Sequence, residues 1–406
     1  MRIFSFYTKL SFATRILLWM LIGSIIGLVV GEPAVIVKPI GDIFLQLLIM
    51  AAIPLVFFNL LSGISSLASS KELGRVGGRI IVYYIFTTIV AITLGLTIMN
   101  LIGAGNGMIL KEEVSGDFGE MPSLADFMIN LVPTNVFKSF AEGNLIQIVV
   151  FALLLGVVVF QLPIEKKKTF QDFFENAALL MRKLVEFVLK ASPLGLGALM
   201  AATFGEFGSK IIGPLSLFIG GVYAAQILMV VLYMGILWFV ARISPLWFLN
   251  RTSELYATTV ATCSSLASLA VSLDIAENRL KLPKSIFSFT LPVGAQFNKD
   301  GTSIMLSGVL IFTAQAAGID LTIPQMIQVV VVGLFLVEGS GGVPGGALVV
   351  AMLYAKAFNL PLEIVAIVGG IYRLIDMGNT TVNCMGDMVA TCVISKAEKN
   401  WSPDIK

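Results

Sequence analysis

Long uncharged runs of apolar residues dominate the first 245 residues of the chain. A helix needs roughly 20 apolar residues to cross about 30 Å of hydrocarbon. Four runs are long enough: Ile43–Ser70, Ile80–Leu110, Gly143–Ile164 and Ile211–Ala241. With the shorter run Ile16–Gly31 and the amphipathic stretch Asn176–Thr203, the pattern predicts six membrane helices in this part of the chain.

The glycines of the first run indicate how its helix packs. Met1–Gly31 contains no Ala-x-Ala-like cleavage site and further apolar runs follow it, so we interpret it as a retained first helix rather than a signal peptide. Gly23, Gly27 and Gly31 recur every fourth residue and therefore share one helix face. Such a row of small residues predicts the close approach of another helix.

The pattern changes after Arg251, where polar clusters interrupt shorter apolar runs. Asn250–Leu273 and Pro324–Phe358 are each too short for two full crossings and carry helix-breaking residues near the middle, which is typical of re-entrant hairpins. Irregular backbone at membrane depth is tolerated only where it is buried in protein or lines a cavity. Two hairpins and two interrupted neighbouring helices therefore predict a polar site near the membrane midplane. The clusters occupy residues 262–265, 298–302, 338–346 and 376–383.

Composition supports a membrane protein and narrows its chemistry. Hydrophobic residues make up 57% of the 406 residues, charged residues 13%, and the mean hydropathy is +0.92, whereas soluble domains carry about 25% charged residues. The 27 basic and 25 acidic residues nearly balance, which argues against a nucleic-acid partner. The absence of histidine excludes histidine-based zinc sites and proton relays.

Basic residues orient the predicted helices, because Lys and Arg accumulate on the cytoplasmic side of membranes. With alternating spans, the basic N-terminus, the segment 71–79 and Lys166–Lys168 fall on one side, whereas the segment 112–120 after the third helix is acidic. Both termini are therefore predicted to be cytoplasmic. Six ionisable residues of the interrupted half would each cost about 2.5–3.5 kcal/mol or more at a helix centre, which indicates function or mutual pairing. They are Lys299, Asp300, Glu338, Arg373, Asp376 and Asp387.

Three motifs in this half resemble those of one transporter family. They are Asn298-Lys299-Asp300-Gly301-Thr302, where the family has Asn-Met-Asp-Gly-Thr; Gly342-Val343-Pro344-Gly345; and Asp376-Met377-Gly378-Asn379-Thr380-Thr381-Val382-Asn383 followed by Gly386-Asp387. In this order they resemble the dicarboxylate/amino acid:cation symporters, the glutamate and neutral amino acid transporter family, over essentially the whole chain. The resemblance implies an all-α polytopic protein of the inner (plasma) membrane, with eight transmembrane helices and two re-entrant helical hairpins, the elevator-type transporter fold.

The resemblance also implies how the chain is divided. Residues 1–110 would hold the first three transmembrane helices, the first two in a static scaffold and the third contributing to a cation site. Residues 111–245 would hold helices 4–6, for the scaffold, trimer contacts and support of the transport domain. Residues 246–396 would form the mobile transport core, and residues 397–406 a cytoplasmic tail. The expected assembly is a homotrimer in the lipid bilayer, with the tip of the second hairpin as the extracellular gate.

The resemblance further implies two rings of oxygen ligands for Na⁺, since hard cations prefer carboxylate, amide, hydroxyl and carbonyl oxygens. The first ring would use Tyr84, Thr87, Thr88, Asn298 and Asp300. The second would use Asp387, Asn383 and the backbone carbonyls around Gly294 and Asn298. The alternatives are that Tyr84 and the threonines only pack or bond to the backbone, and that Asp387 is a surface charge.

Lys299 departs from the family pattern, in which a methionine thioether is usual at this position, and Gln296 replaces a small hydroxyl residue of the same third cation site. An ammonium carries the same unit charge as Na⁺. We therefore interpret Lys299 as a tethered substitute for one coupling cation, which lowers the number of ions moved per cycle. Two alternatives stay open: Lys299 pairs with Asp300 or Asp387 or turns toward water, or it binds and releases a coupling proton.

The substrate residues follow from the needs of an amino acid zwitterion. Asp376 can accept hydrogen bonds from the ammonium group, and Asn383, Ser264 and Ser265 can donate to the carboxylate. Alternatively, Asp376 pairs with Arg373 on its own helix, and the serines only cap a helix. The resemblance adds Thr302, Val343, Gly345, Asn379 and Thr380 to the substrate site.

Position 379 favours a substrate with an uncharged side chain. By resemblance, members that take acidic substrates carry an arginine three residues after the equivalent of Asp376, whereas this chain has Asn379; Thr262 stands where an arginine often precedes the hairpin serines. Arg373 keeps acidic amino acids and dicarboxylates as an alternative. An ion channel is the main rival class; an enzyme is not expected, because no nucleophile–base pair is recognisable. No cofactor is expected apart from the transported Na⁺ or H⁺.

Overall fold

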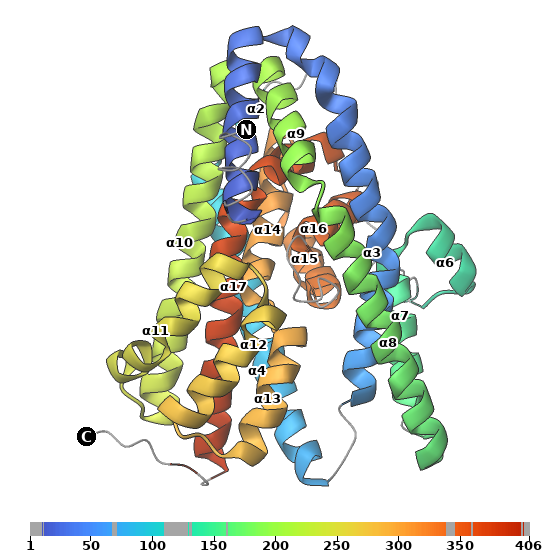
Figure 1. The fold of residues 1–406 in the computed structure, drawn as a ribbon, viewed down its shortest axis with the longest axis vertical. Coiled ribbons are helices and arrows are strands. Elements are labelled where there is room, and N and C mark those ends of the chain that lie inside the picture. The colour runs from blue at the N-terminus through green and yellow to red at the C-terminus, as the bar shows by residue number, and fades with distance from the viewer. Residues whose placement is uncertain are drawn as a thin grey trace.

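The computed structural model describes residues 10, 12–66, 71–108, 129, 132–159, 161–337, 346–358, 360–398 and 401. Every regular element within these ranges is a helix, so the prediction of an all-α fold is confirmed (Figure 1). Two continuous helical stretches of these ranges are long and apolar enough to cross a membrane, Arg75–Ile102 and Ser192–Ala241. The elements of the first half are α2 (Phe12–Val30), η1 (Glu32–Val37), α3 (Lys38–Ser66), α4 (Lys71–Ile102), α6 (Val136–Glu142), α7 (Leu145–Val159), α8 (Ile164–Leu189), α9 (Ser192–Phe207), η2 (Gly208–Ile211), α10 (Ile212–Ile236) and η3 (Leu237–Ala241).

Helices α2 and α9 lie side by side at the N-terminal end of the molecule (Figure 1). A Cβ atom on Gly23 would overlap the carbonyl oxygen of Gly197, and one on Gly27 would overlap that of Ala201. Gly31 instead ends the helical run with a φ of 72°, a left-handed conformation that glycine adopts without strain. The predicted close packing of the glycine row is therefore confirmed for Gly23 and Gly27.

The amphipathic stretch 176–203 is not one helix, so that prediction is wrong. It comprises the end of α8 and most of α9, which are separated at Lys190 and Ala191. Pro193 explains the break, because proline lacks an N–H donor and clashes with the preceding turn inside a helix but is tolerated in the first turn. Helices α7 and α8 pack against α3, away from α10 and α11 (Figure 1).

The second half contains the helices of the predicted polar site. The first predicted hairpin is confirmed as a pair of packed helices that meet at Cys263 and Ser264, where Cys263 has a φ of 49°. Two helices of the second hairpin are described, but its tip, residues 338–345, lies outside the described residues. The elements are α11 (Pro245–Thr262), α12 (Ser265–Asp274), η4 (Ile275–Arg279), α13 (Lys284–Phe297), α14 (Asp300–Ala316), α15 (Ile323–Leu336), α16 (Gly346–Ala357) and α17 (Leu362–Ala397).

Of the two interrupted helices that the sequence predicts, one is interrupted and one is not. Asn298 and Lys299 separate α13 from α14, as expected. Helix α17 runs without a break through its polar cluster, so the prediction of a second interrupted helix is wrong. The segment contains no proline, and its polar residues Asp376, Asn383 and Asp387 recur at helical spacing, which places them on one face of an intact helix.

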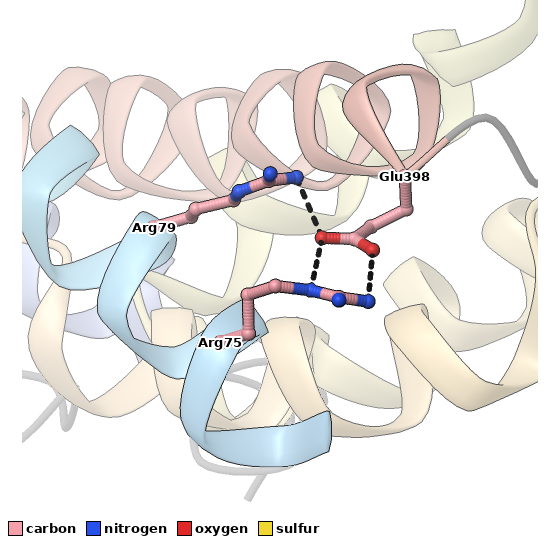
Figure 2. Close-up of polar contacts among 3 residues, drawn as sticks. All are labelled: Arg75, Arg79 and Glu398. Carbon is pink, nitrogen blue, oxygen red and sulfur yellow. Dashed lines mark hydrogen bonds and ion pairs between the residues drawn. The ribbon is translucent and has the colours of Figure 1, made fainter. Parts of the chain in front are cut away.

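The two described residues after α17, Glu398 and Trp401, contact other parts of the molecule. The carboxylate of Glu398 accepts hydrogen bonds from Arg75 and Arg79 of α4, at 2.7 Å from Arg75 Nη2 and 2.6 Å from Arg79 Nη1 (Figure 2). The indole N–H of Trp401 donates to the carbonyl of Leu280 at 3.1 Å, at the base of the first hairpin. We call Glu398 and Trp401 the C-terminal strap, because they join α4 to the chain segment between η4 and α13.

Candidate functional site

Asp300 is the first residue of α14 and is fully buried. Thr88 Oγ1 of α4 donates to its Oδ1 at 3.1 Å, and the Tyr233 hydroxyl of α10 donates to its Oδ2 at 2.5 Å. The positive end of the α14 dipole further favours a carboxylate at this position. Three helices therefore hold the Asp300 carboxylate in one orientation.

Asp387 of α17 is a second buried carboxylate, at 3% exposure, which contradicts the alternative of a surface charge. Its Oδ1 accepts hydrogen bonds from Asn298 Nδ2 at 2.9 Å and from the Tyr84 hydroxyl at 3.5 Å. Gly294 permits this approach, because a Cβ atom there would overlap the Asp387 carboxylate and lie 2.5 Å from the Tyr84 hydroxyl.

The residues expected in the first ring are divided between the two carboxylates. Thr88 contacts Asp300, whereas Tyr84 contacts Asp387. The Thr87 hydroxyl donates to the backbone carbonyl of Tyr84 at 3.3 Å, the backbone alternative, and also interacts with the Asp300 carboxylate. The five side chains of the first ring are all buried, so their hydroxyl, amide and carboxylate oxygens are gathered away from solvent.

Asn298 joins the two expected rings. Its amide group donates to the Asp387 carboxylate and, at 2.8 Å, to the backbone carbonyl of Asn383. Its carboxamide oxygen has no hydrogen-bond donor among the described residues. Burying a carbonyl oxygen without a hydrogen-bond donor costs free energy. A bound cation would offset this cost, because carbonyl oxygens are suitable cation ligands.

Lys299 is a buried lysine, with 1% of its surface exposed. Its ammonium donates to the carbonyl of Ala295 at 2.7 Å and to the carbonyl of Asn298 at 3.2 Å. The positive charge interacts favourably with both Asp300 and Asp387. The ammonium therefore contacts one of the carbonyls expected in the second ring and lies in the field of both acidic residues.

Asn383 fastens α17 to the start of α14. Its Oδ1 accepts the backbone N–H of Gly301 at 2.8 Å, and its Nδ2 donates to Thr302 Oγ1 at 3.3 Å. The backbone carbonyl of Asn383, rather than its side chain, lies beside Asn298. The expected substrate residues Asn383 and Thr302 are thus brought together and are hydrogen-bonded to each other.

The tip of the first hairpin lies against α17. Ser264 is the N-cap of α12 and accepts the backbone N–H of Ala267 at 3.1 Å, which is the alternative of a capping serine. Ser265 is buried and approaches Cys384 of α17. The N-terminal end of α12, a position that favours an anion, therefore lies beside Cys384, the residue that follows Asn383 on α17.

Arg373 and Asp376 are both buried on α17. Arg373 Nη2 donates to the carbonyl of Ala261 at 3.1 Å, so its guanidinium reaches the tip of the first hairpin. Asp376 and Arg373 both interact with Cys263 and Tyr372. A carboxylate and a guanidinium thus both lie near the turn of the first hairpin.

Asn379 is fully buried between α10 and α14. Its Oδ1 accepts a hydrogen bond from Gln226 Nε2 at 2.9 Å, and its Nδ2 lies 3.3 Å from the sulfur of Met305. Gly378 leaves room for Gln226, because a Cβ atom there would overlap its carboxamide. Thr380, the next residue, is also buried. The expected substrate residues Val343 and Gly345 lie outside the described residues.

Comparison with known proteins shows the family of this chain. The model of the sodium:dicarboxylate symporter family matches residues 12–397. The chain belongs to this family. It is 33% identical over 407 residues to a "Proton/sodium-glutamate symport protein" of Bacillus subtilis (strain 168), covering 97% of this chain and 94% of the relative. It is 31% identical to a "C4-dicarboxylate transport protein" of the same organism (94% and 92% covered) and 32% identical to a "Proton/glutamate-aspartate symporter" of Escherichia coli (strain K12) (97% and 94% covered).

Family membership shows the broad functional class of the protein. The symporter is a multi-pass transporter of the plasma membrane and not an enzyme. The buried polar groups of α4, α14 and α17 therefore belong to a membrane transport protein. This confirms the family, the transport class and the membrane setting expected from the motifs.

Helix α10 also contributes to the polar region of the symporter, which the sequence pattern did not predict. Tyr223, Gln226 and Tyr233 of this helix donate hydrogen bonds to Leu374 O, at 2.6 Å, and to the side chains of Asn379 and Asp300. The three residues stand three and seven positions apart and therefore share one face. They are polar residues at helical spacing within an uncharged apolar run, and this spacing is the sequence signal that could have indicated their role.

Proposed function

We propose that this symporter takes up an amino acid with an uncharged side chain together with Na⁺. The observation that carries the proposal is Asn379, which is fully buried and hydrogen-bonded to Gln226. By the resemblance stated above, members that take acidic substrates carry arginine at this position. A carboxamide offers no positive charge to a second substrate carboxylate. Asp376, one turn earlier, is the proposed partner of the substrate ammonium.

The other proposed contacts surround this pair. Ser265, with Ser264 and the first backbone amides of α12, would bind the substrate carboxylate, since a helix N-terminus favours an anion. Asn383, Thr302 and Thr380 would complete the pocket, and Val343 and Gly345 of the second hairpin would cover it. These assignments follow the family motif residue by residue.

The proposed Na⁺ ligands are the oxygens of two groups that share Asn298. Asp300 with Thr88 and Thr87 would form one group, and Asp387 with Tyr84, Asn383 and the carbonyl of Gly294 the other. The ammonium of Lys299 would replace one cation, so that fewer ions move per cycle. Its contacts with the carbonyls of Ala295 and Asn298, oxygens of the kind that bind a cation, support this role.

Uptake by purified protein in proteoliposomes tests the proposal. Labelled alanine, serine, glutamate and succinate would each be offered under an inward Na⁺ gradient and, in separate vesicles without Na⁺, under an inward proton gradient. We expect concentrative uptake of a neutral amino acid driven by Na⁺. Concentrative uptake of only glutamate or succinate would contradict the substrate, and passive flux without accumulation would favour a channel.

A second candidate is an H⁺-coupled symporter of an acidic amino acid or dicarboxylate. The guanidinium of Arg373 favours it, because this group reaches the hairpin tip and could meet a second carboxylate. The names of the relatives, which refer to glutamate, aspartate and C4-dicarboxylates, also support it. Arg373→Gln distinguishes the two candidates, since only the second requires the guanidinium for binding a doubly acidic substrate.

We also propose an elevator mechanism in a homotrimer, with both termini cytoplasmic. The division into a scaffold containing α2, α3, α7 and α8 and a mobile core from residue 246 to 396 follows the family resemblance. The grouping of α3, α7 and α8 on one side supports it (Figure 1). Mass measurement of the detergent-solubilised protein tests the trimer, and labelling of cysteines introduced at each terminus tests the orientation.

A further inference from the structure

Tyr233 lies near the C-terminal end of α10 and is completely buried, with 0% of its surface exposed. Its hydroxyl donates to Asp300 Oδ2 at 2.5 Å, across 67 positions of sequence. A hydrogen bond to an ionised acceptor is shorter and roughly twice as strong as one between neutral groups. The hydroxyl therefore acts directly on the charge of Asp300.

The two oxygens of Asp300 have different partners. Tyr233 holds Oδ2, while Thr88, a residue of the proposed cation site, donates to Oδ1 at 3.1 Å. Gly386 of α17 provides the space for the phenol, because a Cβ atom there would overlap the Tyr233 hydroxyl. The phenol is thus fitted between α14 and α17, and Oδ1 faces the hydroxyls of α4.

We infer that Tyr233 is a positioning residue for the coupling cation: by holding Asp300 Oδ2, it presents Oδ1 and the Thr88 oxygen to the ion in one fixed arrangement. The inference rests on the proposed cation coupling. Ligating carboxylates are commonly oriented by such outer partners, and removing one typically weakens metal binding by about 10- to 100-fold. Tyr233 itself contacts neither the ion nor the substrate in this role.

Tyr233→Phe tests the inference, because it removes the hydroxyl and keeps the ring. Tyr223→Phe is the matched control: it removes a hydroxyl from the same face of α10, but one that donates to the backbone carbonyl of Leu374. Uptake in proteoliposomes would be measured against Na⁺ concentration at saturating substrate, and against substrate at saturating Na⁺. We expect the half-saturating Na⁺ concentration to rise by about tenfold or more for Tyr233→Phe, the substrate KM at saturating Na⁺ to stay within about twofold, and neither to change for Tyr223→Phe.

A half-saturating Na⁺ concentration unchanged in Tyr233→Phe, or raised equally in Tyr223→Phe, would overturn the inference. Wild-type uptake that does not respond to Na⁺ would instead overturn the proposed coupling, so the two failures are distinguishable. If Tyr233→Phe does not fold, 4-aminophenylalanine and 4-methylphenylalanine at position 233 compare a donor with a non-donor of similar size. The donor is expected to retain the wild-type Na⁺ dependence and the non-donor to lose it; equal values for both would again overturn the inference.

Discussion

The ammonium of Lys299 lies 2.7 Å from the carbonyl oxygen of Ala295, four residues earlier in the last turn of α13. The carbonyls at this end of a helix lack intrahelical donors and carry a partial negative charge. A cation is therefore favoured at the C-terminal end of α13, and in this chain that cation is the ammonium of Lys299.

Replacing Lys299 with Met is expected to increase the Na⁺ dependence of uptake. The substitution removes the tethered charge and exposes the carbonyls of Ala295 and Asn298 to an ion, so the number of Na⁺ ions moved per substrate should rise by about one if each unit charge is replaced by another. Parallel ²²Na⁺ and substrate flux measurements give this ratio. Lys284→Met, which removes an exposed lysine from the start of the same helix, is the control; an unchanged ratio in Lys299→Met would count against substitution of an ion.

Replacing Asn379 with Arg is expected to shift the preference from neutral toward acidic amino acids. A guanidinium can bind a second carboxylate bidentately. Gln226 occupies the space beside Asn379, so the double variant with Gln226→Ala should show the shift more strongly than Asn379→Arg alone. Competition by aspartate and serine against labelled substrate measures the preference. If neither variant gains aspartate affinity, position 379 does not set the substrate charge.

Replacing Gly27 with Leu is expected to destabilise the contact between α2 and α9. Even a Cβ atom would overlap the carbonyl of Ala201, and overpacking of this kind costs about 1–3 kcal/mol. Gly213→Ala is the matched control, because nothing lies within 4 Å of a Cβ atom at that helical glycine. Thermal unfolding in detergent should show a lower midpoint for Gly27→Leu alone, and equal midpoints would contradict the packing.

Replacing Glu398 with Gln is expected to loosen the C-terminal strap. The Glu398 side chain is only 8% exposed and faces two arginines, whereas Glu186, in an ion pair with Lys183, is 48% exposed. Exposed pairs contribute about 0–1 kcal/mol, so Glu186→Gln should leave the unfolding midpoint nearly unchanged and Glu398→Gln should lower it. The difference should shrink at high salt; a salt-independent loss would indicate packing rather than charge.

Much of the polar site could be predicted from sequence, because its signals are local. The break at Asn298 and Lys299 and the turn at Cys263 stand out against apolar surroundings, and a buried charge such as Asp387 is costly enough to imply a role. The glycine contacts of α2 could also be predicted from a local pattern, since the spacing of small residues along one helix already defines a face.

The errors arose where a tertiary contact decides the structure. The polar cluster of α17 predicts a break in the helix, yet Asn379, Thr381 and Asn383 find partners on α10, α11 and α14, so the backbone stays helical. Pro193 lies inside the amphipathic stretch that predicts one helix, and it separates α8 from α9. Gln226 and Tyr233 were missed because nothing in an apolar run shows which carboxylate or amide lies opposite.

The amide of Asn298 donates to the carbonyl of Asn383 and to the carboxylate of Asp387 at once. One carboxamide therefore fixes the distance between these two oxygens and clamps α17 to the junction between α13 and α14.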